Sequence, residues 1–481
     1  MPRAHPVTNV RVAIVGSGFG GLGTAVSLKR SGVEDFMILE RADDLGGTWR
    51  DNTYPGCQCD VPSTLYSFSF APNPDWTRTF PLQDEIWRYL RRVADGFALG
   101  PHMRYGHELT AAAWDQARDR WDIETSGGRF TAQVLVLAPG GLSEPAVAAV
   151  PGLEGFRGKV FHSATWDHGH DLRGQRVAVI GTGASSIQFT PRIQPQVAEL
   201  QIYQRTAPWI LPHPDRAVRS WERALWRAFP RSQRVWRAGV WAAREALVLG
   251  LSLEPRMMRA LEQVALAHLR SQVPDPAVRR RLTPSYRLGC KRILISNDYY
   301  PALTQPNAEL ITGGIGSVEP DAIVGADGIR REVDTIICGT GFRVTDPPWT
   351  RGIRGIDGAV LADVWRPSMS AYLGTTVAGF PNVFMITGPN TGLGHSSIVY
   401  MIESQVSYVM AALKTLDELG VRTADVRPEI QAAYNRELQR RLAGTVWNTG
   451  GCRSWYLDQT GRNTTLWPSF TFRFRSRTRR F

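Results

Sequence analysis

The fold is decided by the stretch Val10-Arg-Val-Ala-Ile-Val-Gly-Ser-Gly-Phe-Gly-Gly21. Its β-branched run ends at Gly16, and Gly16, Gly18 and Gly21 have the spacing G-x-G-x-x-G before a helical continuation over 22–30. Such a loop needs glycine for a tight turn, for the close approach of a pyrophosphate, and for packing of the helix on the strand. We therefore predict a strand, a turn and a helix whose N-terminus faces a dinucleotide. The alternative is a glycine turn in a Rossmann-like fold that binds nothing.

A second stretch, Arg176-Val-Ala-Val-Ile-Gly-Thr-Gly-Ala-Ser-Ser186, repeats the pattern one domain length later. It keeps Gly181 and Gly183 but has Ser186 at the third position, where a small side chain still permits helix packing. The next apolar run ends at Gln204-Arg205-Thr206 without an acid, and a guanidinium there can bind a 2′-phosphate. We predict NADPH rather than NADH, bound by Arg205 and Thr206. An ordinary surface charge at Arg205 is the alternative.

The two loops and the apolar runs 134–137 and 334–338 predict an α/β chain with parallel sheets, because continuous apolar runs suit strands covered on both faces. Between Arg216 and Arg281, Trp, Arg, Ala, Leu and Glu recur at helical spacing with prolines as breaks, which predicts a helical insertion in the second nucleotide domain. The predicted organisation has two Rossmann-like dinucleotide-binding domains: residues 1–150 are the first part of a FAD-binding domain, 151–348 the NADP-binding domain with the insertion at about 215–285, and 349–481 the second part of the FAD-binding domain with a C-terminal loop and tail.

The identity of the first cofactor depends on the residues that follow the first helix. Glu40 ends the next apolar run, where a carboxylate can bind the ribose hydroxyls. The segment Gly46-Gly-Thr-Trp49 follows it and resembles flavoprotein monooxygenases rather than NAD dehydrogenases. That resemblance implies FAD in the first domain, with Thr48 and Trp49 among the residues that position it.

Two longer motifs specify the family. Phe156-Arg-Gly-Lys-Val-Phe-His-Ser-Ala-Thr-Trp-Asp167 matches F-x-G-x-x-x-H-x-x-x-W-[PD], and the segment from Gly46 to Asp60 matches [AG]-G-x-W-x-x-x-x-[FY]-P-[GM]-x-x-x-D. Both resemble the signatures of type I Baeyer–Villiger monooxygenases, within the class B flavoprotein monooxygenases. The resemblance extends to Tyr66, Lys291-Arg292, Gly388-Pro-Asn-Thr-Gly392 and Ser454-Trp-Tyr456.

The resemblance implies an enzyme that uses FAD, NADPH and O₂ to convert a ketone into an ester or lactone through a C4a-peroxyflavin. It implies that Arg292 and Asp60 are catalytic, the arginine as a permanent cation and the acid as its orienting partner. Lys291 becomes a second ligand of the 2′-phosphate, Tyr66 a cofactor-binding residue and Trp455 part of a loop that closes over the nicotinamide. The alternatives are a Lys-Arg pair at a solvated helix end, a generic loop acid at Asp60 and a core aromatic at Trp455.

Composition adds limits. The 481 residues include 56 Lys and Arg against 44 Asp and Glu, a net charge of +12 that two anionic dinucleotides could explain without a nucleic-acid partner. The basic run from Phe472 to Phe481 is interpreted as a solvated surface segment, with docking as the alternative. An odd, scattered set of cysteines without CxxC predicts five free thiols in a reducing compartment and no metal site: Cys57, Cys59, Cys290, Cys338 and Cys452.

No charged and apolar leader precedes the first strand, and Arg244 and Glu245 interrupt the most apolar stretch, so we expect a cytoplasmic protein with neither signal peptide nor transmembrane segment. Two strand ends depart from the family pattern: Ala138-Pro139, where Thr usually follows Ala, and Cys338-Gly-Thr-Gly341, where Ala-Thr-Gly is usual. A flavin monooxygenase that oxidises nitrogen or sulfur stays open as an alternative. So does a non-oxygenating flavoprotein electron carrier, bound to a membrane or partner.

Overall fold

The computed structural model describes residues 7–147 and 149–481; residues 1–6 and Ala148, which belong to the predicted first segment, lie outside it. The opening stretch folds as the strand β1 (Thr8–Val15), a turn and the helix α1 (Phe19–Arg30). β1 lies between β2 (Phe36–Leu39) and β6 (Gly128–Leu137) and is parallel to both. Its side chains are buried on both faces, as Val12, Ala13 and Ile14 show. This is why the run is continuously apolar rather than alternating.

The first sheet has the order β17-β4-β5-β6-β1-β2-β3, and β18 also pairs with β6. Strands from the late part of the chain join it, so the chain leaves this sheet and returns to it after building a second one. The return strand β18 runs parallel to β6. The remaining strands of this sheet are β3 (Met103–Arg104), β4 (Leu109–Asp115), β5 (Arg120–Thr125), β17 (Ile353–Arg354) and β18 (Val383–Met385).

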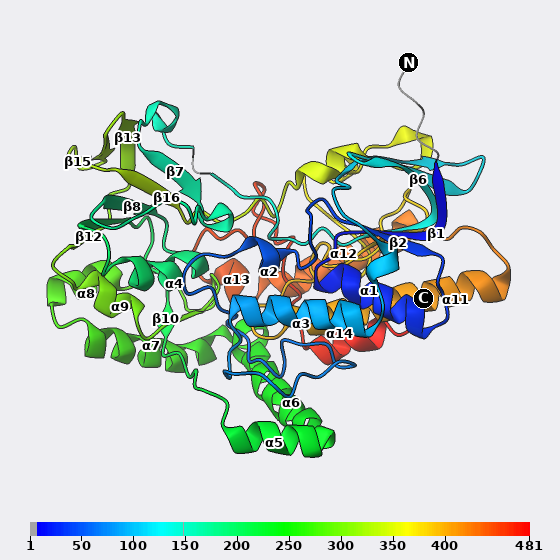
Figure 1. Cartoon of the computed structure of the whole chain (residues 1–481), viewed down its shortest axis with the longest axis horizontal. Helices are drawn as coiled ribbons and strands as arrows, with labels where there is room; N and C mark the ends of the chain where they lie inside the picture. Colours follow the sequence, from blue (N-terminus) through cyan, green and yellow to red (C-terminus); the bar gives the residue numbers. More distant parts are fainter. Residues whose placement is uncertain (1–6, 148) are drawn as a thin grey trace.

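The second sheet is fully parallel, with the order β12-β9-β8-β16-β7. The second glycine loop connects β8 to the helix α4 (Ala184–Ile193). A small antiparallel sheet, β13-β14-β15, lies beside it, and both appear at the left of Figure 1. The strands are β7 (Lys159–His162), β8 (Arg176–Ile180), β9 (Glu199–Tyr203), β12 (Ala308–Ile311), β13 (Ile315–Glu319), β14 (Ala322–Gly325), β15 (Arg330–Glu332) and β16 (Thr335–Cys338).

These two sheets confirm the predicted α/β class, while the domain boundaries at 150 and 348 stay predictions. Two chain segments that connect the sheets, around residues 144–146 and 341–343, are hydrogen-bonded to each other. The Ala146 amide donates to the Gly341 carbonyl (2.8 Å), and the Arg343 amide donates to the Glu144 carbonyl (2.8 Å). The paired connections hold the carboxyl ends of both sets of strands near one another, which is where ligands bind in open α/β sheets.

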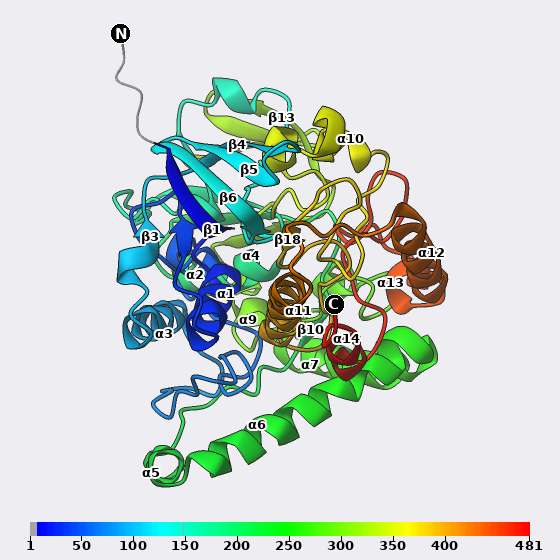
Figure 2. The ribbon, with the colours of Figure 1, turned by 90° about the vertical axis from the view of Figure 1, so that its right-hand side faces the viewer.

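The range 215–285 contains a group of helices that extends along the bottom of the molecule in Figures 1 and 2. Helix α6 is the longest of them, and a π-helical turn over Leu249–Leu253 follows it. The short strands β10 (Ile210–Leu211) and β11 (Leu294–Ile295) pair on either side of this group along the chain. The helices are α5 (Ser220–Ala228), α6 (Pro230–Glu245), α7 (Met258–Gln272) and α8 (Pro276–Leu282).

Among the remaining helices, α9 packs against α4 and β12 beside the second sheet. Helices α1 and α11 lie side by side in both ribbon views. No helix of the described residues combines the length and apolarity that crossing a membrane requires. These helices are α2 (Thr48–Asp51), α3 (Gln83–Gly96), α9 (Tyr299–Leu303), α10 (Leu361–Val364), α11 (Ile398–Leu419), α12 (Pro428–Ala443), α13 (Val446–Thr449) and α14 (Thr471–Arg477).

The C-terminal run lies at the surface with most of its residues exposed, as its charges suggested, but it is anchored to the fold. It forms α14, whose Phe474 is fully buried, and Phe481 places its ring 5.2 Å from that of Tyr408 on α11. The arginines of the run cover aromatic faces, since the Arg475 guanidinium lies 5.0 Å from the ring of Tyr400. Alternating Phe and Arg therefore packs the tail onto the fold, because long cationic side chains can lie along apolar surface.

The expectation of five free thiols is wrong for two cysteines. Cys290 and Cys452 form a disulfide across a sequence separation of 162, with Cα atoms 6.1 Å apart. The sequence carries no spacing signal for this bridge, because tertiary folding alone brings the two segments together. Cys57 and Cys59 are buried thiols, and burial raises the pKa of Cys57 to about 12.

Candidate active site

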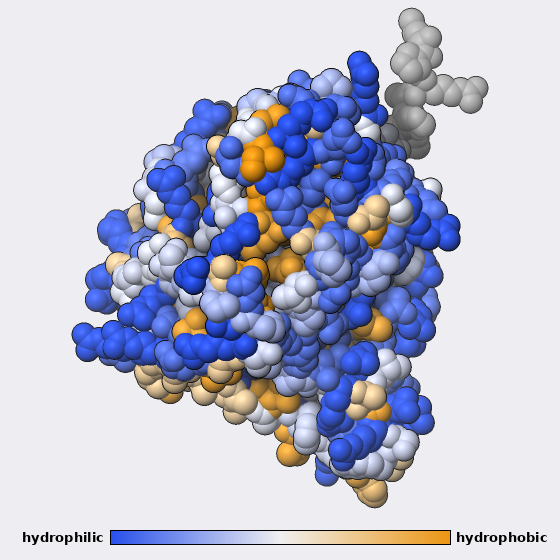
Figure 3. All heavy atoms as spheres, turned by 90° about the vertical axis from the view of Figure 1, so that its left-hand side faces the viewer, coloured by the Kyte–Doolittle hydropathy of each residue, from blue (hydrophilic) through white to orange (hydrophobic). Residues whose placement is uncertain are grey.

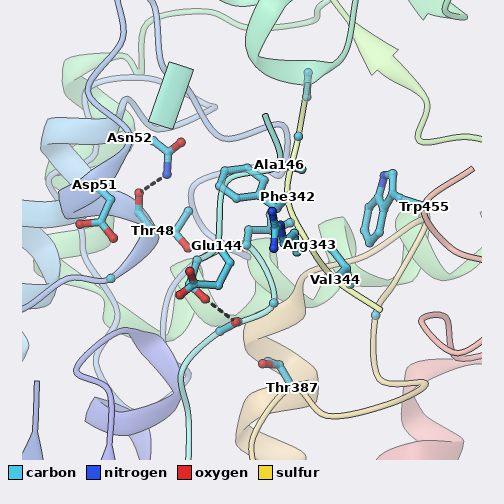
Figure 4. A pocket seen from close by; sticks show the side chains of 18 of the residues that line it. Thr48, Asp51, Asn52, Glu144, Ala146, Phe342, Arg343, Val344, Thr387 and Trp455 are labelled. Atoms are coloured by element: carbon cyan, nitrogen blue, oxygen red, sulfur yellow. Dashed lines mark hydrogen bonds between the residues drawn. The ribbon is translucent and has the colours of Figure 1, made fainter. Parts of the chain in front are cut away.

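One cavity, of about 1200 Å³, lies where the two sheets meet, and both glycine loops line it. Figure 4 shows Thr48 on one side of it and Trp455 on the other, with Phe342 and Arg343 between them. The cavity collects every predicted site residue except Gly21 and Ser186. Those that line it are Gly16, Gly18, Glu40, Thr48, Trp49, Asp60, Tyr66, Gly181, Gly183, Arg205, Thr206, Lys291, Arg292 and Trp455.

In the first glycine loop, Gly16 and Gly21 are each required to be glycine, but for different steric reasons. Gly16 has φ +97°, and a Cβ there would stand 2.4 Å from the Ala138 carbonyl oxygen. A Cβ on Gly21 would stand 1.8 Å from the oxygen of Gly16, so this glycine lets α1 pack on the loop instead of lining the cavity. A Cβ on Gly18 would meet nothing nearer than Gly47, at 3.8 Å, which leaves the Gly18 backbone open to the cavity. The loop therefore has the geometry of a phosphate-binding turn.

The second glycine loop explains one departure from the family pattern. Gly181 has φ +104°, and a Cβ there would lie 2.5 Å from the Gly339 carbonyl oxygen. Ser186 is buried, and its Oγ occupies the space that a Cβ on Gly339 would need, at 2.0 Å. Ser186 at the third position and Gly339 in place of alanine therefore fit each other, so the two deviations compensate.

Glu40 directly follows β2, and neighbouring side chains and amides hold its carboxylate. Ser17 donates from its amide (3.0 Å) and its hydroxyl (2.6 Å) to one oxygen, and Arg50 donates to the other (2.9 Å). Burial alone would raise the pKa of Glu40, but the hydrogen bonds from Ser17 and Ala42 and the charge of Arg50 lower it overall. The carboxylate stays ionised, and each of its oxygens accepts two hydrogen bonds, from Ser17 on one side and from Ala42 and Arg50 on the other. A ribose hydroxyl bound here would have to share or displace one of these donors.

An aromatic group flanks this region. Trp49 on α2 donates its indole N–H to the Tyr66 hydroxyl (3.0 Å), and the ring of Tyr66 packs edge-on against Phe19 with centroids 5.2 Å apart. Thr48 begins α2, and its carbonyl accepts from the Asn52 side chain at 2.9 Å, as Figure 4 shows. These contacts fix Trp49 and Tyr66 as rigid parts of the cavity wall.

The central charge pair joins residues that are 232 positions apart. Arg292 donates from Nε to Asp60 Oδ2 (2.6 Å) and from Nη2 to Oδ1 (2.5 Å), which is a bidentate ion pair. Asp60 raises the pKa of Arg292 by its charge and hydrogen bonds, although burial opposes it. Burial would raise the pKa of Asp60, but the charge of Arg292 lowers it. Both groups are therefore ionised, and one third of the arginine side chain stays exposed toward the cavity.

Two further cations lie along the cavity wall of the second sheet. Lys291 and Arg205 both line the cavity, and burial together with the charge of Arg205 lowers the pKa of Lys291. The Lys291 ammonium lies 5.1 Å from the ring centroid of Tyr286. Among the described residues neither cation has a carboxylate partner within ion-pair distance. Like charges held together without a counterion make a site for an anion.

The chain also resembles known proteins. Residues 13–231 match the family model described as pyridine nucleotide-disulphide oxidoreductase. The chain is 54% identical over 473 residues to a Baeyer–Villiger monooxygenase of Streptomyces coelicolor, covering 98% of this chain and 91% of that one. It is 50% identical to a Baeyer–Villiger monooxygenase of Pseudomonas aeruginosa, covering 100% of this chain and 92% of that one. The chain belongs to the Baeyer–Villiger monooxygenases.

Solved structures agree with this assignment of the Baeyer–Villiger monooxygenase family. The closed crystal structure of cyclohexanone monooxygenase superposes with a TM-score of 0.88 at 28% identity, covering 98% of this chain and 97% of that one. A structure of OTEMO in complex with FAD and NADP superposes with a TM-score of 0.87 at 25% identity and the same coverage. The resemblance inferred from the motifs is thus confirmed.

In this Baeyer–Villiger monooxygenase, Trp455 is 44% exposed, so it is not the core aromatic that was the alternative. It stands at the edge of the cavity with its ring 4.6 Å from that of the buried Tyr456. The disulfide at Cys452 ties the segment that carries Trp455 to the segment that carries Arg292. His162 ends β7, is buried, and accepts from the Ala164 amide (3.1 Å); burial lowers its pKa, which favours a structural role.

Sequence reasoning missed several residues of the cavity wall. Arg343 brings another guanidinium to it, two residues after the small-residue end of β16. Thr464 and Thr465 also line it, and their hydroxyls are buried without a hydrogen-bond partner among the described residues. Buried hydroxyls without partners are costly unless a ligand satisfies them. The glycine cradles and these hydroxyls together fit a large polar cofactor.

Proposed function

We propose that this Baeyer–Villiger monooxygenase, which uses FAD and NADPH with O₂ to convert a ketone into an ester or lactone, transfers oxygen beside the Arg292–Asp60 pair. The observation that supports this placement is the bidentate ion pair in a cavity bordered by both glycine loops. Arg292 supplies the charge, and Asp60 is a positioning residue that acts through it. Oxidation of nitrogen or sulfur is not favoured.

When bound and reduced by NADPH, FAD supplies the activation of O₂. The protein contributes a fixed positive charge where negative charge develops during transfer. Arg292 suits this task because Asp60 raises its pKa further, so the guanidinium does not release a proton at any physiological pH. Asp60 occupies Nε and Nη2 and thereby fixes the plane of the guanidinium, which leaves Nη1 for the substrate side.

We assign the FAD site to the first glycine loop, where Gly16 and Gly18 leave the backbone accessible and Gly21 packs the helix. Glu40 would hold the ribose, and Thr48, Trp49 and Tyr66 would form the wall beside the ring system. The unpartnered hydroxyls of Thr464 and Thr465 are available for the same cofactor.

We assign the NADPH site to the second glycine loop. Gly181 and Gly183 would face the pyrophosphate, with Ser186 as the packing residue. Arg205 and Lys291 would bind the 2′-phosphate beside Thr206, which relieves the repulsion that lowers the pKa of Lys291. Trp455, at the exposed edge of the cavity, would cover the nicotinamide.

The experiment that tests this function supplies a panel of ketones and one thioether with NADPH and O₂ and identifies products by mass. We expect ester or lactone from at least one ketone, with NADPH consumption that matches product. Sulfoxide formation without any ester would favour the alternative oxygenase. Substrate-independent release of hydrogen peroxide, without oxygenated product, would contradict oxygen transfer altogether.

A further inference from the structure

Helix α6 and the turn after it present an uncharged face to solvent. From residue 235 to 253 the exposed side chains are all apolar or glycine, including Val235, Trp236 and Leu253. The three charged residues of this stretch are turned inward. Arg237 donates to the carbonyls of Thr64 and Ser67 (2.8 Å each), Arg244 is half-buried near Asp60, and Glu245 accepts from Thr471 (2.8 Å). This arrangement is the reverse of that in an ordinary surface helix, whose charged side chains face water and whose apolar side chains face the core.

The same surface concentrates the large apolar side chains that are most exposed. Ten such side chains of the described residues are more than half exposed, and six of them lie between residues 221 and 257. We call these six the apolar face: Trp221 (58%), Phe229 (66%), Val235 (73%), Trp236 (51%), Leu253 (62%) and Met257 (53%). Helices α5, α6 and α7 carry or flank them along the bottom of Figures 1 and 2, and Figure 3 shows apolar atoms along the same lower edge. Patches of this kind on a folded protein mark interaction sites.

Exposed arginines border the apolar face; Arg227 and Arg256 pair with Asp75 and Glu254, whereas three others have no partner among the described residues. Arg231, Arg234 and Arg259 are exposed and form no ion pair within the described part of the chain. Carboxylates are scarce there, because between residues 219 and 273 Glu222, Glu245 and Glu262 are buried and only Glu254 is exposed. The apolar face thus has a positively charged border.

We infer that the apolar face is a docking surface for an anionic lipid bilayer. Tryptophan and phenylalanine are the side chains that lie at the boundary between headgroups and acyl chains, and arginines on the polar border attract anionic headgroups. A second copy of the chain fits less well, because a two-fold contact would place this border against itself with little negative charge to offset it. An apolar dimer interface does not need arginines around it, whereas binding to an anionic bilayer does. The positively charged border therefore favours the lipid surface.

The test measures sedimentation of the FAD-loaded enzyme with vesicles of phosphatidylcholine alone and of equal parts phosphatidylcholine and phosphatidylserine. We expect binding to the mixed vesicles and a blue shift of tryptophan emission that Trp236→Ser reduces. The double variant Phe229→Ser/Trp236→Ser should lose binding. The double variant Arg231→Ser/Arg234→Ser should bind about 25-fold more weakly, at roughly fivefold for each arginine near a charged surface.

Matched controls change the same residue types elsewhere. Leu419→Ser removes an apolar side chain that is 68% exposed at the end of α11, and Arg436→Ser removes an exposed cation on α12. Both should bind vesicles like the unchanged enzyme, and all variants should keep their NADPH-dependent activity without vesicles, which shows that they fold. The inference is overturned if mixed vesicles are not bound, or if the controls lose as much binding as the test variants. A concentration-dependent dimer that Trp236→Ser abolishes would assign the face to a second copy instead.

Discussion

Replacing Arg292 by methionine removes the charge of the guanidinium while keeping a side chain of similar length and flexibility. Asp60 then loses both hydrogen bonds, at 2.6 and 2.5 Å, and the cation that lowers its pKa. Loss of one preorganised charge-stabilising donor costs about 3–4 kcal/mol in the transition state, so ester formation should fall on the order of 10²–10³-fold. FAD should still bind, because the first glycine loop and Glu40 do not contact this arginine.

The same change also affects stability, and the two effects can be separated. An uncompensated buried carboxylate costs about 3–5 kcal/mol, but these side chains are 33% and 22% exposed, so we expect roughly 1–2 kcal/mol. The double variant Arg292→Met/Asp60→Asn removes both charges and should regain most of that stability. It should regain none of the activity, since the cation is still missing.

The assay follows ester by mass together with FAD content, NADP⁺ affinity and the midpoint of chemical unfolding. Arg292→Lys is the matched control, because it keeps a positive charge but cannot form the bidentate pair. Its rate of ester formation should lie between those of the unchanged enzyme and Arg292→Met. If Arg292→Met formed ester at the unchanged rate with both cofactors bound, the charge-based reasoning would be refuted. If the double variant recovered activity along with stability, Arg292 would be a structural residue.

Other predictions concern the second loop and the disulfide. Lys291→Met should raise KM for NADPH about tenfold and leave KM for NADH nearly unchanged, since only the 2′-phosphate contact is lost. In the unchanged enzyme, KM for NADPH should begin to rise at a pH below the usual lysine range. The reason is that the pKa of Lys291 is lowered, and its positive charge is lost as pH rises through that pKa. Equal effects on both nucleotides would exclude that contact. Gly339→Ala should destabilise the protein by about 1–3 kcal/mol in urea unfolding, because its Cβ meets the Ser186 hydroxyl at 2.0 Å, and Ser186→Ala should rescue it; an additive double variant would contradict the steric pairing. Cys290→Ser should lower the free energy of unfolding by up to about 5 kcal/mol for a loop of this length, and alkylation of the unfolded, unreduced enzyme should label Cys452 only in that variant.

Local chemistry determined much of this protein. The glycines of both loops are steric requirements of a strand–turn–helix unit, so Gly16 and Gly181 could be placed from the sequence with the helices that follow them. Continuous apolar runs identified β6 and β16 for the same reason, since period and burial are properties of short segments. The motifs around Trp49 and Phe156 identified the family, which the relatives confirm.

Only the tertiary structure decided what depends on segments far apart in the chain. The family resemblance implied that Asp60 orients Arg292, but only the fold gives their bidentate contact across 232 residues. The disulfide between Cys290 and Cys452, across 162 residues, runs against the sequence expectation of free thiols. Neither leaves a local pattern, because each results from how the second sheet and the late loops pack against the first. The apolar face has the same origin: its residues look like core in the sequence, and burial is settled by which neighbours cover them. A sequence lists which side chains are present, whereas their neighbours, and hence their charge state and exposure, are properties of the folded chain.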